Sequence, residues 1–216
     1  GIAIAFPNQK FKLLEFFDHK MIKLLQEGNN NNQFQNVSNI YEHIDNRVLS
    51  VVIERRMDKI DPIKKNVLIS TCHFPCKYRD ENLMSKLASS IREYHIKTTK
   101  DKKCSINFLA GDFNILPDTA SYDALIGKNN NQNYLISCHK LKHGKEPEFT
   151  NINWNKGLRK AEFKGCLDYI LSTQDTVNMI YEFTSLCGLM IDKPDRQVPN
   201  GVCPSDHFPV SIIARF

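Results

Sequence analysis

Short apolar, β-branched runs on either side of one long amphipathic segment constrain most what this chain can fold into. The runs have the length and composition of strands: RVLSVVIERR (47–56), NVLISTCHF (66–74) and SINFLAGDF (105–113). The amphipathic segment, residues 80–99, starts at Asp80, a residue type that caps helices, and has apolar residues at helical spacing, namely Leu83, Leu87, Ile91 and Tyr94. Strands interleaved with helices predict an α/β or α+β fold.

The remaining segments give weaker signals. We expect a short buried strand at 1–6 and leave 11–25 open between strand and helix. The pattern further predicts a short helix at 119–127 closed by Gly127, a strand at 166–172 and a terminal strand within 203–216. Polar or turn-forming stretches predict mobile surface loops or turns at 27–36, 61–65 and 129–133. Because there is no internal repeat and no linker, we expect one domain over residues 1–216.

The net charge and the cysteine content bear on the binding partner and on the cellular compartment. The formal net charge of +5 suits a phosphate-bearing partner, although a solvated surface would look the same. The seven cysteines, an odd number at irregular spacing, predict reduced thiols in an intracellular protein. No apolar run reaches the roughly 18 to 20 residues of a membrane span, and the first residues lack the basic start of a signal peptide. Cys72 and Cys76 flank His73, but no second pair with finger-like spacing follows, which argues against zinc.

Four short segments put histidine, aspartate or asparagine at the ends or in the middle of expected strands. They are TCHFPC (His73), GDFN (Asp112 and Asn114), CLDYI (Asp168) and SDH (Asp206 and His207). Side chains at i and i+2 of a strand point the same way, so Asp112 and Asn114 can converge on one ligand. Oxygen donors of this kind suit Mg²⁺ or Mn²⁺, and a histidine beside a carboxylate can stabilise charge on a phosphate. The set therefore predicts metal-assisted attack of water on a phosphate ester.

A purely structural interpretation of the same residues stays open. Asp112 is also a common type of turn residue, and Asp206 can form a turn or a cap before His207. Asp168 fits that interpretation less well, because a carboxylate inside an apolar strand costs several kcal/mol unless it is paired or hydrogen-bonded.

Taken together, GDFN, LDYIL and SDHFPV, preceded by a strand that ends in histidine, resemble the endonuclease/exonuclease/phosphatase superfamily, which includes DNase I-like nucleases. The resemblance runs over nearly the whole chain, from GIAIAF to Phe216. FTN at 149–151 further resembles an element of the deadenylase-like members, and HFPC resembles the HMPC variant of a less characterised branch. The resemblance implies a four-layer sandwich, in which two mainly antiparallel sheets are flanked by helices.

The resemblance also implies roles for the residues that match the motifs, and the first group concerns water and metal. Asp112 would orient or deprotonate the attacking water, or bind a second metal. Asn114 would hold the phosphate or that metal. Asp206 would bind Mg²⁺ or Mn²⁺, either directly or through water.

The second group that the resemblance implies concerns the phosphate. His207, oriented by Asp168, would contact the scissile phosphate. His73 would help to stabilise charge on the non-bridging phosphate oxygens. Asn151, the last residue of FTN, would contact the substrate near the leaving group.

One part of the family pattern lies outside this sequence. The principal metal ligand of the family is a glutamate in a QE motif, on a strand upstream of the one that GIAIAF resembles, and an asparagine further upstream belongs to the same site. The first glutamates here, Glu15 and Glu27, lie downstream of that position. We therefore expect these residues to be the C-terminal three quarters of the domain, with its first strands missing, and this fragment to be weakly active or inactive.

Three functions fit these observations. The first is a Mg²⁺-dependent phosphodiesterase acting on nucleic acid, with RNA ahead of DNA, which FTN and the positive charge favour. The second is an inositol phosphate or lipid phosphatase, or a sphingomyelinase-type phosphodiesterase, with LCGLMIDKP (186–194) as the candidate apolar loop. The third is a non-catalytic relative that lacks the metal-binding glutamate. The intact set of polar residues argues against the third: Asp112, Asn114, Asp168, Asp206 and His207.

Overall fold

The structure is a computed structural model of the 216-residue chain. It describes residues 1–27, 45–56, 65–77, 79–128, 130, 133–155, 160–180, 182–187, 199 and 205–215. Most of the expected loops and turns at 27–36, 61–65 and 129–133 lies outside these residues, as does 188–194 of the expected apolar loop. Among the described helices, none is long and apolar enough to cross a bilayer. The described cysteine side chains are free thiols: Cys72, Cys76, Cys104, Cys138 and Cys166. The intracellular setting stays a prediction.

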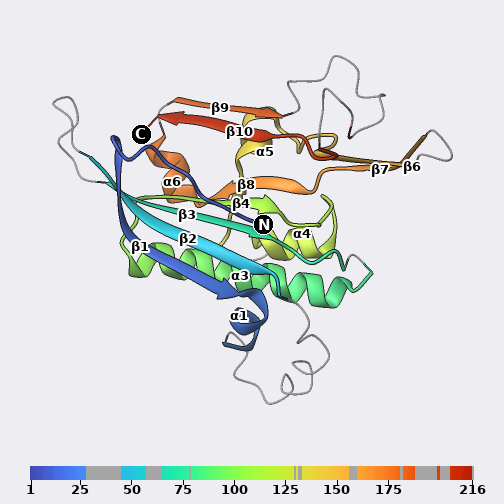
Figure 1. Cartoon of the computed structure of the whole chain (residues 1–216), viewed down its shortest axis with the longest axis horizontal. Coiled ribbons are helices and arrows are strands. Elements are labelled where there is room, and N and C mark those ends of the chain that lie inside the picture. Colours follow the sequence, from blue (N-terminus) through green and yellow to red (C-terminus); the bar gives the residue numbers. More distant parts are fainter. Residues whose placement is uncertain are drawn as a thin grey trace.

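A six-stranded mixed sheet forms the centre of the fold (Figure 1). Its strands follow the order β1 (Phe11–Lys20), β2 (Arg47–Arg55), β3 (Asn66–His73), β4 (Ile106–Asp112), β8 (Asp168–Ser172) and β5 (Ile136–Ser137). β3 and β4 run parallel and are joined by the long helix α3 (Glu81–Asp101), whereas the other neighbours are antiparallel. β2, β3 and β4 confirm the three strands that the apolar runs predict.

Two smaller sheets and four short helices complete the described part of the chain. β6 (Asn151–Asn155) pairs with β7 (Lys160–Gly165), and β9 (Glu182–Cys187) pairs with β10 (Val210–Arg215), both antiparallel. The short helices are α1 (Met21–Glu27), α4 (Ala120–Ile126), α5 (Cys138–His143) and α6 (Gln174–Met179). In the view of Figure 1, α3 lies below β3 and β4, α1 lies below β1, and β9 and β10 lie above β8. This architecture confirms the α/β class.

The two helices that the sequence predicts, α3 and α4, are both present, whereas α5 and α6 were not predicted. The Asp80 side chain accepts a hydrogen bond from the Leu83 amide at 3.0 Å, which caps the first turn of α3. Leu83, Leu87 and Ile91 are then buried in the main hydrophobic cluster. Burial of each such side chain contributes roughly 1.5–3 kcal/mol, so this face holds α3 against the sheet. α4 ends at Gly127, whose left-handed backbone (φ 71°) confirms the expected closure.

Residues 1–6 form no strand, so that prediction is wrong. Ile4 and Phe6 instead pack against a small cluster that contains Val51 and Ile53 of β2. A strand needs a hydrogen-bonded neighbour, and none of the described strands pairs with this segment. Ile4 and Phe6 are therefore only half-buried, and they cover part of the sheet without extending it.

The segment 11–25, which its pattern leaves open between strand and helix, is both. It is strand β1 as far as Lys20 and helix α1 from Met21 onward. Lys20 pairs with Arg47, the first residue of β2, so a strand continued past Lys20 would have no partner in β2. The chain turns helical at that point and buries its apolar residues on α1: Met21, Ile22, Leu24 and Leu25.

A chain of buried polar groups crosses the core between the sheet and α3. Ser50 and Ser70 share a hydrogen bond of 2.7 Å, and Oγ of Ser70 lies 2.9 Å from Nδ1 of His95. Nε2 of His95 lies 3.1 Å from the amide oxygen of Asn107, whose amide nitrogen donates to Thr176 at 2.7 Å. Because an amide oxygen only accepts, Nε2 of His95 carries the proton and Nδ1 accepts from Ser70. All five residues are fully buried, and each finds a partner in this polar chain.

Stability is expected to fall in mild acid because His95 is buried without charge. Burial lowers the pKa of His95 from 6.5 to about 4, so between these values the unfolded chain binds a proton that the folded chain does not. The free energy of unfolding should therefore have its full value above pH 6.5 and decrease by up to about 3 kcal/mol as the pH falls to about 4. Urea denaturation above and below pH 6.5 measures this loss.

His95→Gln is the matched variant for the acid effect, because glutamine keeps polar groups at the position and does not titrate. This variant should be less stable than the wild type at neutral pH, with a shallower loss of stability in acid. If the acid loss were the same in both proteins, other groups would have to cause it.

Candidate active site

Strand register brings three of the expected site residues into one row. In the parallel pair β3–β4, His73 lies beside Asp112, and in the antiparallel pair β4–β8, Asp112 lies opposite Asp168. Neighbours at the same level of a sheet carry their side chains on the same face. Each of the three is the terminal residue of its strand, so the row lies at the edge of the sheet, where loops can add further groups.

The row depends on the glycine before Asp112. Gly111 has φ 153°, and a Cβ atom at this position would lie 2.0 Å from the carbonyl oxygen of Cys72. Only glycine lets β4 approach β3 this closely, one residue before the two strands deliver His73 and Asp112.

The loop after β4 fixes the carboxylate of Asp112. The backbone amide of Asn114 donates to Oδ1 of Asp112 at 2.9 Å, and Asn114 has the left-handed backbone (φ 50°) that closes this turn. The side-chain amide of Asn114 donates to the carbonyl of Phe74 at 3.0 Å and lies 3.4 Å from Oδ2 of Asp112. Asp112 and Asn114 therefore lie side by side, although Asn114 follows the strand and does not belong to it.

Two histidines approach Asp112 from different parts of the chain. Oδ2 of Asp112 lies 3.3 Å from Nε2 of His73 and 3.8 Å from Nε2 of His207. The other ring nitrogen of His207, Nδ1, lies 2.9 Å from Oδ2 of Asp168. A carboxylate only accepts hydrogen bonds, so Nδ1 of His207 carries a proton, and Nε2 is the nitrogen that faces Asp112.

The segment 205–208 is held beside β6. Asn151, the first residue of β6, forms a β-bridge with His207, and the amide of Ile152 donates to the carbonyl of Asp206 at 2.9 Å. The side-chain amide of Asn151 lies 3.4 Å from Oδ2 of Asp206. These contacts bring the FTN and SDH motifs together, although they lie far apart in the sequence.

One cavity of about 680 Å³ contains most of these side chains. Six expected site residues line it: His73, Asp112, Asn114, Asn151, Asp206 and His207. Asp168 is not in the lining and reaches the cavity through its hydrogen bond to His207. Apolar side chains complete part of the wall, among them Met84, Leu116 and Phe163.

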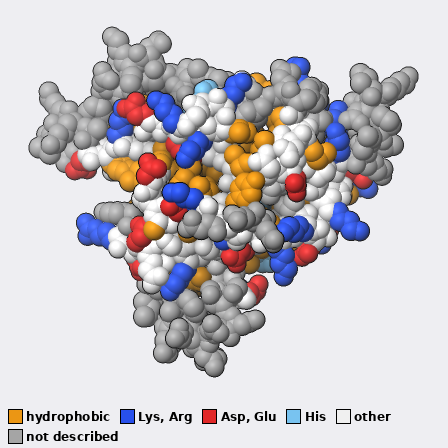
Figure 2. Space-filling model, turned by 180° about the vertical axis from the view of Figure 1, so that it is seen from behind, with side chains coloured by type: hydrophobic (Ala, Val, Ile, Leu, Met, Phe, Trp, Pro, Cys, Tyr) orange, Lys and Arg blue, Asp and Glu red, His pale blue; other side chains and the backbone are white. Residues whose placement is uncertain are grey.

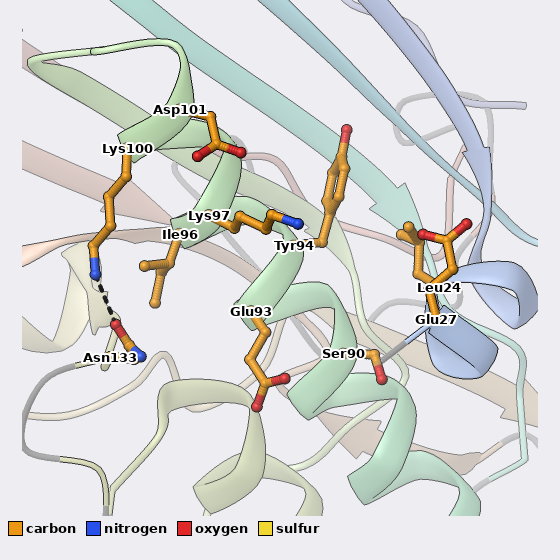
Figure 3. Close-up of a pocket in the computed structure, with 10 residues that line it drawn as sticks. All are labelled: Leu24, Glu27, Ser90, Glu93, Tyr94, Ile96, Lys97, Lys100, Asp101 and Asn133. Atoms are coloured by element: carbon orange, nitrogen blue, oxygen red, sulfur yellow. Dashed lines mark hydrogen bonds between the residues drawn. The ribbon is translucent and has the colours of Figure 1, made fainter. Parts of the chain in front are cut away.

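A second hollow, of about 490 Å³, lies beside α1 and α3 (Figure 3). Its lining mixes both signs of charge, with Glu27, Glu93, Asp101, Lys97 and Lys100. Lys100 donates to the side chain of Asn133 at 3.0 Å. The lining contains no histidine or cysteine, so the cavity at the edge of the sheet is the better candidate for acid–base or metal chemistry.

Burial and charge shift two pKa values at this site. The pKa of Asp112 is raised, chiefly by burial and further by the nearby charge of Asp168, while the hydrogen bond from the Asn114 amide opposes the shift. The pKa of His207 is raised, chiefly by its hydrogen bond to Asp168. A carboxylate and a histidine that both hold protons more readily than usual are suited to take part in proton transfer.

The donor set of the cavity fits a hard divalent cation. Among the described residues, ligand atoms of Asp112, Asp168 and His207 lie within 4.8 Å of one another. Two partly buried carboxylates at adjacent strand ends repel each other, and a cation would relieve that repulsion. Asp168 and His207 are already bonded to each other. Among the described residues, Asp112, Asp168 and His207 therefore form the group that could hold a divalent metal ion.

Sequence reasoning missed two residues of the site. Thr150 is fully buried and donates a hydrogen bond to Asp168 at 2.6 Å. Its one signal in the sequence is its place in FTN, where the resemblance drew attention to Asn151 alone. Phe163 lines the cavity from β7, a strand that the apolar pattern does not predict.

The chain resembles known proteins in structure but not in sequence. No family model and no curated protein matches the sequence. The human Nocturnin catalytic domain aligns with 97% of this chain at 17% identity and a TM-score of 0.55. ANGEL2, a 2′,3′-cyclic phosphatase, aligns with 97% at 14% identity and a TM-score of 0.62. An endonuclease/exonuclease/phosphatase family protein from Bacteroides thetaiotaomicron aligns with 95% at 15% identity and a TM-score of 0.54.

The chain is shorter than each of these proteins. It spans 62% of the Nocturnin chain, 68% of the ANGEL2 chain and 64% of the Bacteroides chain. Likeness at this level of identity establishes the fold and leaves the activity to be argued from the site. The chain therefore shares the fold of these three proteins, one of which is an endonuclease/exonuclease/phosphatase family protein, and this agrees with the fold that its motifs predict.

Proposed function

We propose that the protein is a hydrolase that uses Mg²⁺ or Mn²⁺ to cleave phosphodiesters in nucleic acid, with RNA ahead of DNA. The observation that carries this proposal is the meeting of Asp112, His73 and the hydrogen-bonded pair His207–Asp168 at one cavity. These groups come from β3, β4, β8 and the segment before β10, and together they supply a base and two cationic or hydrogen-bonding groups. Hydrolysis of a phosphate ester requires such a set around one phosphorus.

Each side chain acts on a different atom of the proposed reaction. Asp112 accepts a proton from the attacking water, a role that its raised pKa favours. As the new P–O bond forms and the bond to the leaving oxygen breaks, His73 and His207 donate hydrogen bonds to the phosphate oxygens, and the leaving oxygen takes up a proton from solvent water. Asn151, on the same cavity, donates a hydrogen bond near the leaving group.

A bound Mg²⁺ or Mn²⁺ would supply a Lewis acid that offsets the negative charge of the phosphate. Asp112, Asn114 and Asp206 provide the oxygen donors that would hold it. EDTA should therefore suppress turnover, and added Mg²⁺ should restore it.

Three features support nucleic acid as the substrate. Phe163 and Leu116 place an aromatic and an aliphatic side chain in the wall of the cavity, where a base can stack beside the phosphate. The net charge is +5, although on the face that Figure 2 shows, opposite to the view of Figure 1, lysine and arginine side chains are spread among acidic ones and not gathered in a stripe. ANGEL2 was solved in complex with adenosine-2′,3′-vanadate, a ligand that contains ribose.

Cleavage assays on the purified full-length gene product test the proposal. The substrates are labelled poly(A) RNA, duplex DNA with an abasic site and a panel of phosphoinositides, each with Mg²⁺ and with EDTA. We expect RNA cleavage that EDTA abolishes and that His207→Ala lowers by about 10²- to 10⁴-fold. His143→Ala, which removes a histidine of α5 outside the cavity lining, is the control and should leave the rate unchanged.

The other outcomes of the assay separate the alternatives. Release of inorganic phosphate from the phosphoinositides alone would replace the proposal with an inositol phosphate or lipid phosphatase. Absence of turnover on every substrate would indicate a non-catalytic relative. Cleavage of nucleic acid that persists in EDTA would remove the metal from the proposal.

A further inference from the structure

Thr150 is a buried residue that binds the carboxylate of Asp168. Its side chain is fully buried, and it belongs to none of the strands. Oγ1 of Thr150 accepts hydrogen bonds from the backbone amides of Leu167 at 2.8 Å and of Asp168 at 3.0 Å. The same oxygen lies 2.6 Å from Oδ2 of Asp168.

These three contacts fix the direction of each hydrogen bond. A hydroxyl group has one proton and two lone pairs that can accept. The two backbone amides occupy both lone pairs, so the proton of Thr150 points to Oδ2 of Asp168. Rotation of the Asp168 carboxylate away from this position would leave a buried hydroxyl proton without its partner, which is unfavourable.

The same carboxylate oxygen orients His207. Oδ2 of Asp168 accepts a second hydrogen bond, from Nδ1 of His207 at 2.9 Å. With the proton on Nδ1, Nε2 is the nitrogen that faces Asp112. The hydroxyl of Thr150 thus determines, two hydrogen bonds away, which ring nitrogen of His207 is presented to the cavity.

Thr150 also holds the segment of His207 through its backbone. Its carbonyl accepts a hydrogen bond from the Phe208 amide at 2.7 Å, and its amide donates to the carbonyl of Gly165 at 2.9 Å. The neighbouring ring of Phe149 packs edge-on against Phe208, with centroids 5.5 Å apart. The backbone contacts do not depend on the identity of the side chain, so the hydroxyl can be removed while they remain.

We propose that Thr150 is a positioning residue of this site, which fixes the Asp168 carboxylate and thereby the orientation and tautomer of His207. The proposal rests on the phosphoesterase function proposed above. Thr150 is absent from the lining of the cavity, so it acts through Asp168 and does not touch the substrate. This role requires a hydroxyl group at position 150. Serine can therefore replace threonine there, and valine cannot.

Two substitutions of Thr150 and one matched control test this role. T150V keeps the shape and removes the hydroxyl, whereas T150S keeps the hydroxyl. The control is T176V: Thr176 is equally buried, its Oγ1 accepts from the backbone amide of Asn107 at 3.0 Å, and it lies outside the cavity lining. We expect T150V to lower kcat about 10- to 100-fold with little change in KM, and T150S to stay within a few-fold of the wild type. T176V should lose stability and keep its kcat.

Two kinetic results for T150V would overturn the proposal. One is a wild-type kcat in T150V, and the other is an equal loss of kcat in T150V and T176V, which would indicate a general effect of a weakened core. Failure of T150S to restore the rate would show that the methyl group matters and not the hydroxyl.

Nuclear magnetic resonance separates this proposal from the proposed function. If the wild type turns over none of the substrates, the phosphoesterase function fails, but the ¹⁵N signals of the neutral His207 ring still report its tautomer. We expect the Nδ1–H tautomer in the wild type and in T150S, and a mixture of tautomers in T150V. The same tautomer in all three proteins would remove the positioning role.

Discussion

Replacing Asp112 by asparagine is expected to lower kcat/KM by about 10³-fold and at the same time to raise the melting temperature. Activity falls because an amide cannot accept the proton of the attacking water. Stability rises because burial, and then the charge of Asp168, raises the pKa of Asp112. Above that raised pKa the ionised carboxylate costs free energy in the folded state that a neutral amide does not. Initial rates with added Mg²⁺ measure the first effect, and thermal denaturation without added metal measures the second.

Asp123→Asn is the matched control for this substitution. Asp123 pairs with Lys128 at 3.0 Å on the surface of α4 and does not line the cavity. The control should keep its kcat/KM and should not gain stability. Full activity in Asp112→Asn would exclude Asp112 from catalysis, and a lower melting temperature would show that the fold depends on its charge.

Gly111→Ala is expected to lower the free energy of unfolding by at least about 3 kcal/mol, or to prevent soluble expression. The added Cβ atom would lie 2.0 Å from the carbonyl oxygen of Cys72, a backbone atom of β3, at a φ of 153° that side chains rarely adopt. β4 would have to move away from β3, which would separate His73 from Asp112. Urea denaturation measures the loss, and residual activity should fall with it.

Gly144→Ala distinguishes close strand contact from simple backbone strain. Gly144 also has a positive φ, of 77°, but no atom lies within 4 Å of a Cβ added there. This control should cost only about 1 kcal/mol, the strain of a left-handed residue. Equal losses in the two variants would show that Gly111 is not needed for the approach of β3 and β4.

The parts of the fold that the sequence predicts are those that local patterns decide. The β-branched runs of β2 and β3 identify strands whatever they pair with, and Asp80 caps α3 through its own third neighbour, Leu83. The segment 11–25 could not be predicted, because its change from strand to helix depends on Arg47, where the partner strand begins.

The pairs β6–β7 and β9–β10 follow the same rule. β6 and β7 have the sequences NINWN and KAEFKG, which contain few apolar residues and are stabilised by pairing with each other. Their existence depends on a partner that no local pattern reveals, and for the same reason the sequence did not predict β9.

Among the site residues, elementary physical chemistry alone marked Asp168 most clearly. A carboxylate in an apolar strand must be paired, and Asp168 is bound by Thr150 and His207. His73 and Asp206 stood out by their positions in expected strands, the family resemblance assigned them to one site, and both line the cavity. The sequence does not mark Thr150, because its role depends on the three groups around its hydroxyl: the amides of Leu167 and Asp168 and the Asp168 carboxylate.

The buried polar chain from Ser50 to Thr176 favours one register of the central strands over its alternatives. A slip of one residue would turn Ser50, Ser70 or Asn107 to the opposite face of the sheet. Its former hydrogen-bond partners would then stay buried without a partner, at a cost of roughly 1–3 kcal/mol for each unsatisfied group. Purely aliphatic contacts would tolerate such a slip more readily. The hydrogen bonds inside the core thus select the strand register that sets the positions of His73, Asp112 and Asp168 at the strand ends.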